Sequence, residues 1–414
     1  MADLLTPNAV IVGGGPAGLT AARSLRAAGV SDVLVLERES EAGGIPRHSD
    51  HSGYGIRDLG RILKGQAYAR RLADRARESG AEILTSATVT GWAGDRSLLV
   101  TTPNGRVQVD ARTVILATGA RERPRAARMV PGDRPTGVYT TGQLQQAVYL
   151  QHESVGHRAV IVGSELVSWS AVLTLRHAGC RVALMTTEFE SPEVFWPIAF
   201  AGRALLDGPL ARATRVVRII GRSRVEAVEI EYLASGIRRT VACDTVVFTG
   251  DWVPDHDLAR LAGIELDRGH LGPLVDTRLA TSVDGVFAAG NLLHPVDTAD
   301  VAALDGRHVA ESVVGWLAGE RGPRSAVRLV AEQPFGWVSP GLIGEYRQGP
   351  PRDRLLLWST EARAFPTVVM RQGGSVIGRR TLPWSVSPGR MFRVPWSVAR
   401  RVDPRGGDVT IGLS

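Results

Sequence analysis

The stretch AVIVGGGPAG, residues 9–18, decides the fold. Four apolar residues that favour a strand lead into three consecutive glycines, and residues 19–28 then read as a helix. This order of strand, glycine turn and helix is typical of a dinucleotide-binding fold. Gly13 permits the tight turn, Gly15 lets a pyrophosphate approach the backbone, and Gly18 lets the helix pack closely on the strand. The amides at the start of the helix would then face the phosphates.

An acidic residue follows at the spacing that this fold requires. The apolar run at residues 33–36 reads as the next strand and ends at Glu37, about 20 residues after Gly18. An acid at this place hydrogen-bonds a ribose hydroxyl and favours a ribose without a phosphate. A glycine-rich turn without a ligand is the alternative, but strand, turn, helix, strand and acid in this order favour a nucleotide site.

Length and composition limit the class of protein. The chain has 414 residues, enough for two or three domains, and its 44% hydrophobic and 22% charged residues predict an ordinary globular core. No apolar run approaches the ~18 residues that span a bilayer, and residues 1–8 carry no basic segment of the kind that begins an export signal, so we expect a cytoplasmic protein. Cys180 and Cys243 are the only cysteines, so the chain supplies no cysteine set for zinc or an iron–sulfur cluster.

The net charge of +7 raises the question of nucleic-acid binding. The charge comes from scattered arginines, Lys64 is the only lysine, and no basic stripe is interleaved with aromatic residues. The densest run, at residues 121–128, could face an anionic ligand but reads more simply as a solvated loop. We therefore expect no nucleic-acid partner.

Further segments carry a family resemblance. Together with residues 13–18, the segments EAGG at 41–44, TVILATG at 113–119 and TSVDGVFAAGN at 281–291 resemble the flavoproteins with two dinucleotide-binding folds, the family of thioredoxin reductase and other pyridine nucleotide–disulfide oxidoreductases. The resemblance covers about residues 8–320. It implies an α/β protein with two Rossmann-like domains, the first of them discontinuous.

The resemblance also implies domain boundaries. We expect an FAD-binding domain at residues 1–125 and 268–320, with an inserted β-meander, and a degenerate NAD(P)-type domain at residues 126–267. Residues 325–414, with short β-rich runs between glycine and proline turns, predict a small β-rich module. Four of the nine tryptophans lie there and would serve either a subunit interface or the module's core: Trp337, Trp358, Trp384 and Trp396.

The site residues that the resemblance implies come from several segments. In this family the first fold holds FAD, the ATG segment lines the nucleotide site, and a late Gly-Asp pair, here Gly290-Asn291, bonds the ribityl and phosphate part. The asparagine can still hydrogen-bond a hydroxyl through its amide. The expected cofactor-binding residues are Gly13, Gly15, Pro16, Ala17, Gly18, Glu37, Arg38, Gly43, Gly44, Val89, Ala117, Thr118, Gly119, Gly290, Asn291, Thr298 and Ala299. The last two begin a predicted helix whose N-terminus would point at the pyrimidine end of the flavin.

The second fold has lost its fingerprint. The strand at residues 159–162 is followed by Gly163, but Glu165 and Ser168 stand where the second and third glycines belong. A side chain at the second position obstructs the approach of a pyrophosphate, and a carboxylate there repels it. We therefore predict that NADH or NADPH binds this fold poorly or not at all.

The redox centre of the disulfide reductases is also missing. No cysteine pair follows Gly43-Gly44 or lies within the second fold, so dithiol chemistry is excluded. In the wider family the loop after the Gly-Gly lies near the isoalloxazine ring, where Arg47 could stabilise an anionic reduced flavin and His48 could exchange protons. In the simpler alternative, Arg47 bonds a phosphate or a carboxylate and the histidines only satisfy loop backbone. His48 and His51 without a third ligand do not predict a metal site.

A narrower resemblance suggests a functional role. The stretch GGIPRHSDHSGYGIRD at residues 43–58, the segment YARR at 68–71, FTG at 248–250 and FAAGNL at 287–292 resemble the FAD-dependent subunits of heteromeric dehydrogenases. Examples are the B subunit of hydrogen cyanide synthase, the A subunit of opine oxidase and the α subunit of dye-linked L-proline dehydrogenase. Many of them have a cysteine where Ser49 stands, and several carry a cysteine-rich C-terminal cluster module, which is absent here.

The resemblance implies an FAD-dependent oxidoreductase without a redox-active disulfide. In such complexes a partner subunit with its own flavin oxidises an amino acid, an imino acid or a related amine, and this type of subunit relays electrons. Two alternatives stay open. The chain could be a nucleotide-holding scaffold without chemistry of its own, with ATP, AMP or NAD in the same site, or it could be a stand-alone flavin oxidase or reductase.

Overall fold

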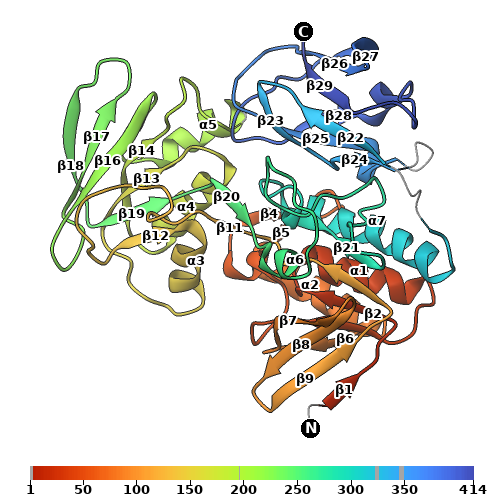
Figure 1. Cartoon of the computed structure of the whole chain (residues 1–414). Helices are drawn as coiled ribbons and strands as arrows, with labels where there is room; N and C mark the ends of the chain where they lie inside the picture. Colours follow the sequence, from red (N-terminus) through yellow and green to blue (C-terminus); the bar gives the residue numbers. More distant parts are fainter. Residues whose placement is uncertain (1–2, 195, 322–325, 345–348) are drawn as a thin grey trace. The chain divides into compact units, whose positions relative to one another are not determined.

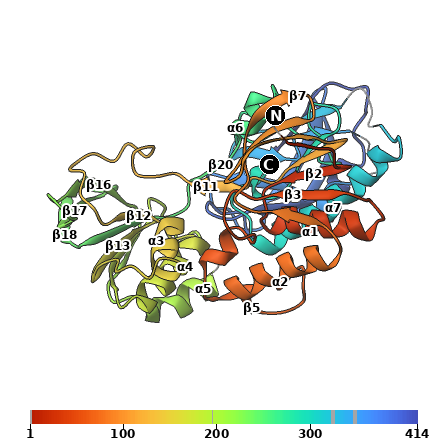
Figure 2. The ribbon, with the colours of Figure 1, turned by 90° about the horizontal axis from the view of Figure 1, so that it is seen from below.

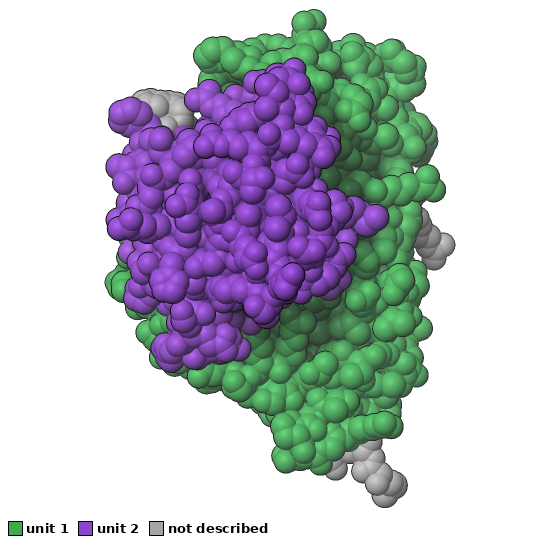
Figure 3. Space-filling view, turned by 90° about the vertical axis from the view of Figure 1, so that its left-hand side faces the viewer, with its two compact units in different colours: residues 1–47, 53–120, 254–414 green, residues 48–52, 121–253 purple. Residues whose placement is uncertain are grey.

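The computed structural model describes residues 3–194, 196–321, 326–344 and 349–414. The chain forms two compact units, drawn in green and purple in Figure 3. Unit 1 consists of Met1–Arg47, Gly53–Ala120 and Pro254–Ser414, and unit 2 of His48–Ser52 and Arg121–Val253. In the part of the chain that the structure describes, no helix is both long and apolar enough to cross a membrane.

A parallel sheet of five strands forms the centre of unit 1 (Figure 1). Its order is β21 (Val286–Ala288), β10 (Thr113–Leu116), β2 (Ala9–Val12), β3 (Val33–Leu36) and β6 (Glu82–Leu84). Every residue of β2, β3, β10 and β21 is buried, as continuous apolar runs require in a sheet covered on both faces. Parallel strands bring their carboxyl ends, and the loops that follow them, to one edge of the sheet.

Helices cover one face of this sheet and a β-meander covers the other. Figure 2 shows α1 (Pro16–Ala27), α2 (Gly65–Glu78) and α7 (Ala299–Leu317) on one side of β2 and β3, with β7 on the other. The second sheet has the order β1 (Asp3–Leu5), β9 (Gly105–Asp110), β8 (Ser97–Thr102) and β7 (Thr88–Gly94). Leu98 and Val100 of β8 pack in the same core as the parallel sheet.

The chain crosses between the units at different residues from those expected. Apart from the short excursion at His48–Ser52, the chain leaves unit 1 after Ala120 rather than at residue 125, and it returns at Pro254 rather than at residue 268. The return comes earlier because Ala259, in α6 (Asp257–Leu261), and Ile264 are buried in the core of unit 1. The two connecting segments, β11 (Ala120–Glu122) and β20 (Trp252–Pro254), pair as a two-stranded sheet.

Unit 2 contains the second parallel sheet, with helices on one face. Its strands are β12 (Val138–Thr140), β19 (Thr245–Phe248), β13 (Arg158–Val162), β14 (Arg181–Thr186) and β15 (Leu210–Ala211), in this order. The helices are α3 (Thr141–Tyr149), α4 (Leu166–His177) and α5 (Trp196–Gly202). An antiparallel sheet packs on the opposite face and consists of β16 (Thr214–Ile220), β17 (Ala227–Tyr232) and β18 (Arg238–Ala242). The predicted α/β fold with two Rossmann-like sheets is confirmed.

The C-terminal residues of unit 1 form a β module with its own core. One sheet has the order β24 (Leu342–Ile343), β22 (Val327–Ala331), β29 (Val409–Leu413), β26 (Thr367–Gln372) and β27 (Ser375–Thr381). The other has the order β23 (Phe335–Ser339), β25 (Arg354–Ser359) and β28 (Phe392–Pro395). Trp396 lies in the core between them, whereas Trp384 is 40% exposed. Trp337 is buried with Leu356 and Met391, and both Trp358 and Val296, from the loop before α7, pack against this cluster.

Candidate functional site

The glycine turn after β2 leaves open space at one position only. A Cβ atom at Gly13 would lie 2.4 Å from the carbonyl oxygen of Ala117, and a Cβ atom at Gly18 would lie 2.0 Å from that of Gly13. Both positions are therefore closed to any larger residue. A Cβ atom at Gly15, in contrast, would meet nothing nearer than the Cα of Gly44 at 4.0 Å. The backbone at Gly15 thus faces a space that a pyrophosphate could enter.

The start of α1 has no side chain of its own to satisfy its first amides. Gly15 is the N-cap, Pro16 opens the helix, and the first turn carries no acidic residue. Free amides and the helix dipole favour an anion at this end. The open space at Gly15 and these amides together fit the phosphates of a dinucleotide.

Glu37 is held in place beside the turn. Its side chain is buried, and its two carboxylate oxygens accept hydrogen bonds of 2.8 Å from the amides of Gly14 and Glu39. Each oxygen keeps a second lone pair, so the carboxylate can still accept a ribose hydroxyl. The neighbouring Arg38 does not face the turn, because its side chain is 67% exposed and its guanidinium lies 3.4 Å from the carboxylate of Asp255.

The ATG segment lies directly against the turn. Ala117 is buried against Gly13, as the carbonyl contact at that glycine shows. The hydroxyl of Thr118 donates to the carbonyl of Asp255 at 2.7 Å, and Gly119 has a φ of 77°, which favours glycine. Val89 of β7 is half-buried and pairs with Val100 across the meander. The structure thus brings Ala117 and Thr118 to the nucleotide edge of the sheet.

Gly290 and Asn291 reach the same edge from the far end of the sequence. A Cβ atom at Gly290 would lie 2.8 Å from the Cβ of Ala17, so this turn touches the start of α1. The amide nitrogen of Asn291 donates to the carbonyl of Asp297 at 2.9 Å. Its side-chain oxygen is buried and has no partner among the described residues. An unsatisfied acceptor here fits a hydroxyl donor such as that of a ribityl chain.

The start of α7 brings together two residues that the sequence reasoning missed, Asp300 of the helix itself and Arg57 of a remote loop. Thr298 is the N-cap, and its hydroxyl donates to Asp300 at 2.5 Å. Asp300 is buried, accepts the amide of Val301 at 3.0 Å and forms an ion pair of 3.2 Å with Arg57. An aspartate one residue after Ala299 is a helix-start signal that could have indicated Asp300, whereas Arg57 comes from a remote loop.

The loop after β3 explains the position of Arg47. The amide of Gly43 donates to the carbonyl of Gly14 at 2.8 Å, which brings the Gly-Gly pair to the nucleotide turn. The guanidinium of Arg47 pairs with Glu39 and lies 3.6 Å from Glu41. Arg47 therefore bonds carboxylates of its own loop, in agreement with the simpler of the two interpretations.

We expect Arg47→Ala to affect the fold more than the cofactor. Its loss leaves Glu39 and Glu41 to repel each other, and because both are partly exposed we expect a decrease of only about 1 kcal/mol in the free energy of unfolding, measured in urea. Arg47→Lys, which keeps the charge, is the control. Unchanged stability together with a shifted midpoint potential of a bound flavin would instead assign Arg47 to the cofactor.

The other catalytic candidate, His48, belongs to unit 2. Its side chain is 2% exposed, and its Nδ1 lies 3.3 Å from the side-chain nitrogen of Gln146 in α3. The Nε2 of His51 lies 2.5 Å from the hydroxyl of Ser170 in α4. Arg47 and His48 thus bond to different groups, and the structure does not join them into one catalytic pair.

The glycine turn of the second fold is filled by a carboxylate. A Cβ atom at Gly163, which opens the turn after β13, would lie 2.9 Å from one side-chain oxygen of Glu165, and a Cβ atom at Gly250, in the loop after β19, would lie 2.0 Å from the other. A second buried acid, Glu193, accepts hydrogen bonds of 2.8 Å from the hydroxyls of Ser164 and Thr187. Burial and the nearby Glu193 raise the pKa of Glu165 to about 7. Two buried carboxyl groups thus lie at the turn after β13, where the amide of Ser164 donates to both Glu165 and Glu193.

The described residues contain neither a reactive thiol nor a metal cluster. Cys180 and Cys243 are buried and free, and burial raises the pKa of each thiol to about 12. Such thiols remain protonated at neutral pH and are poor nucleophiles. Among residues 3–194, 196–321, 326–344 and 349–414, no group of three or more His, Cys, Asp or Glu side chains could hold a metal ion.

Comparisons with known proteins agree with this geometry. The model of the pyridine nucleotide-disulphide oxidoreductase family matches residues 7–306. The ferredoxin reductase component of chlorobenzene dioxygenase from Cupriavidus sp. (strain PS12) is 30% identical over 69% of this chain and 67% of its own length. The A subunit of opine oxidase from Agrobacterium tumefaciens is 27% identical over 75% of this chain and 64% of its own length.

A solved structure supports the same fold. Thioredoxin reductase from T. acidophilum superposes with a TM-score of 0.64 at 21% identity and covers 76% of this chain and 99% of its own. The fold and the family match define the class, which is that of the FAD-dependent oxidoreductases. The chain belongs to the pyridine nucleotide-disulphide oxidoreductase family, and the predicted family is confirmed.

Proposed function

We propose that the chain holds FAD in unit 1 and is the electron-relay subunit of a heteromeric dehydrogenase or oxidase that acts on an amino acid, an imino acid or a related amine. The observation that carries this proposal is the contrast between the two glycine turns. Gly15 faces open space beside the fixed Glu37 carboxylate, whereas Glu165 occupies the equivalent turn of the second fold. The turn in unit 1 thus has room for the phosphates of a dinucleotide, whereas the Glu165 side chain occupies the turn in unit 2.

The residues of unit 1 suit the successive parts of FAD. The amides of the turn from Gly13 to Gly18 would bind the pyrophosphate, and the Glu37 carboxylate would accept from the adenosine ribose. The free side-chain oxygen of Asn291 would accept from the ribityl chain, and the amides at Thr298 and Ala299 would meet the pyrimidine end. When bound, FAD accepts a pair of electrons and can pass them on singly.

The closed second fold argues for a partner subunit. We infer that no nicotinamide cofactor binds beside Glu165, and the two free, buried cysteines form no disulfide that could exchange electrons with the flavin. Electrons must therefore arrive from a substrate or from another protein. The opine oxidase relative and the ferredoxin reductase component are both named as parts of multi-component systems, which supports the second route.

Two alternatives have a specific basis. A scaffold subunit that holds ATP, AMP or NAD would use the same phosphate turn and the same Glu37, because neither feature recognises the isoalloxazine ring. A stand-alone oxidase or reductase would need residues of this chain to activate the substrate. Arg47 and His48, the candidates for that task, are bonded to other protein groups.

The first test is to identify the nucleotide that co-purifies with the chain. Mass spectrometry of the released nucleotide, with an absorption spectrum of the protein, should show FAD in a one-to-one ratio. Glu37→Gln should weaken its retention, and Glu82→Gln, at an exposed position in β6, is the control. ATP, AMP or NAD in place of FAD would contradict the flavin assignment and favour the scaffold.

A second test separates the relay subunit from the stand-alone enzyme. The purified chain is mixed without oxygen with L-amino acids, cyclic imino acids and secondary amines, and the absorbance of the flavin is followed. A relay subunit should stay oxidised alone and become reduced only when co-expressed with the product of an adjacent flavoprotein gene. Rapid bleaching of the isolated chain by one of these compounds would overturn the relay assignment.

A further inference from the structure

The C-terminal module lies outside the family match, which ends at residue 306. Its charged side chains contact the segments of unit 1 that we propose would face the flavin. Arg393 of β28 and Arg352 of η4 (Pro351–Asp353) each reach a buried aspartate beyond the module. The two aspartates, Asp297 and Asp305, lie before and within α7.

Asp297 links the two candidate flavin-binding turns. Its backbone carbonyl accepts the side-chain amide of Asn291 at 2.9 Å, and one oxygen of its carboxylate accepts the backbone amide of Thr298 at 2.9 Å. The side chain of Asp297 is 2% exposed, so water does not screen its charge. The guanidinium of Arg393 lies 2.6 Å from the same oxygen and is the only cation paired with it in the described part of the chain.

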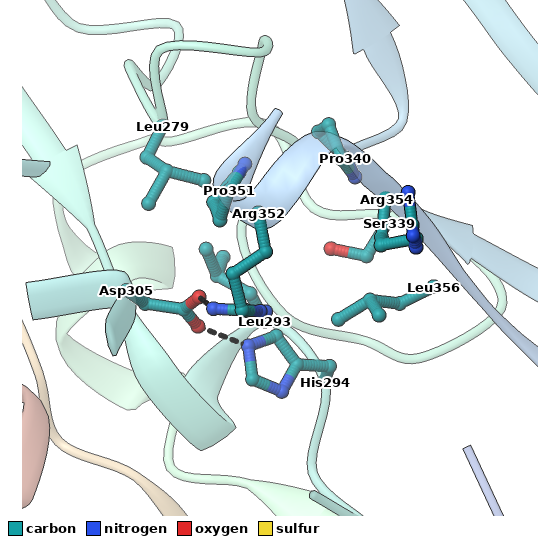
Figure 4. Close-up of a pocket in the computed structure, with 10 residues that line it drawn as sticks. All are labelled: Leu279, Leu293, His294, Asp305, Ser339, Pro340, Pro351, Arg352, Arg354 and Leu356. Carbon is teal, nitrogen blue, oxygen red and sulfur yellow. Dashed lines mark hydrogen bonds and ion pairs between the residues drawn. The ribbon is translucent and has the colours of Figure 1, made fainter. Parts of the chain in front are cut away.

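Asp305 forms the second buried pair. Figure 4 shows its carboxylate between Arg352 and His294, and both contacts are direct hydrogen bonds. Although burial alone would raise the pKa of Asp305, the Arg352 guanidinium and His294 hold it well below the usual range. This pair anchors the module to the first half of α7.

Apolar packing completes the junction. Trp337, Leu356 and Met391 of the module are buried together, and Val296 packs against them from the loop before α7. The ring of Trp337 also meets that of His270 edge-on, with 5.4 Å between centroids. The arginine pairs are therefore held in a packed junction, and each is expected to keep a defined geometry.

We propose that Arg393 is a positioning residue that sets the reduction potential and the affinity of the flavin by neutralising Asp297. This proposal rests on the proposed function. Without Arg393, a buried carboxylate would remain uncompensated next to Thr298, at the end of α7 that would face the pyrimidine part of the flavin. Negative charge at that place opposes the addition of electrons to the flavin and disturbs the bonds from Asn291 and Thr298.

The test measures the FAD midpoint potential by dye equilibration and the FAD dissociation constant by fluorescence. Arg393→Met should make the potential more negative and weaken binding about tenfold, within the range expected for mutations in a coupled network. Arg393→Lys, which keeps the charge, should stay near the unmodified protein. Arg379→Met, at an exposed position in β27, is the matched control and should change neither value.

The double variant Asp297→Asn with Arg393→Met separates charge from packing. Because the double variant removes the buried charge as well as its partner, its flavin potential should return toward that of the unmodified protein. The double variant also remains a test of the proposal if the single variant folds poorly. An equal potential in Arg393→Met and the control overturns the proposal, as does a double variant as negative as the single one. If the unmodified chain binds no FAD, the proposed function fails instead.

Discussion

Gly15→Glu is expected to abolish FAD binding while the protein remains folded. The substitution copies into the first fold the residue that closes the second. A carboxylate at this position meets the pyrophosphate, and two like charges about 4 Å apart repel by roughly 4 kcal/mol at the effective dielectric of a protein surface. We therefore expect the dissociation constant to rise about a thousandfold, measured by flavin fluorescence.

The fold should tolerate this change because of the local geometry. A Cβ atom at Gly15 has no neighbour within 4.0 Å apart from the Gly44 Cα at that distance, and the backbone there has a φ of −82°. Gly18→Ala should instead unfold the domain, since its Cβ would lie 2.0 Å from the Gly13 carbonyl oxygen. Gly94→Glu, at the exposed end of β7, is the matched control. Retention of FAD by folded Gly15→Glu protein would show that the nucleotide lies elsewhere.

Glu165 is expected to make the stability of the protein depend on pH. Burial and the repulsion from Glu193 raise the pKa of Glu165 from 4.5 to about 7, so the folded state holds its proton more tightly than the unfolded state does. This contribution to stability is complete below pH 4.5 and is lost as the pH rises to about 7, by an amount of the order of 3 kcal/mol. Arg128 faces the same carboxylate and partly opposes the shift.

Glu165→Gln tests this dependence directly. A neutral amide has no charge to bury, so the free energy of unfolding of this variant in urea should lose most of its decline between pH 4.5 and 7. At pH 8 the variant should be more stable than the unmodified protein. Glu190→Gln, an exposed change in the same unit, should leave the pH profile as it was. Superimposable profiles for Glu165→Gln and the unmodified protein would refute the raised pKa.

The sequence alone was sufficient to predict those elements whose structure depends on residues close together in the chain. The strand, the glycine turn and the helix around residues 9–18 depend on steric limits within a few residues, and the acid at Glu37 depends on one βαβ unit. The departure of the second turn from the glycine fingerprint was also visible in the sequence, because Glu165 stands where the fingerprint has a glycine. The sequence also argued against dithiol chemistry, because no cysteine pair follows Gly43-Gly44 or lies within the second fold.

Other expectations needed the tertiary structure. The return of the chain at Pro254 depends on the burial of Ala259 and Ile264 against a sheet formed by remote segments, which no local pattern encodes. The sequence left two interpretations open for Arg47 and His48, and only the structure showed which groups the fold brings near them.

The sequence by itself determined that the protein has one intact and one degenerate dinucleotide turn, because steric access and charge at a glycine position are properties of that residue. Only the tertiary structure decided which charges meet in the interior. Asp300 with Arg57, Asp297 with Arg393 and Asp305 with Arg352 join residues far apart in the chain. The physical reason is that a buried charge must find an opposite charge in space, and its distance along the sequence does not restrict which one.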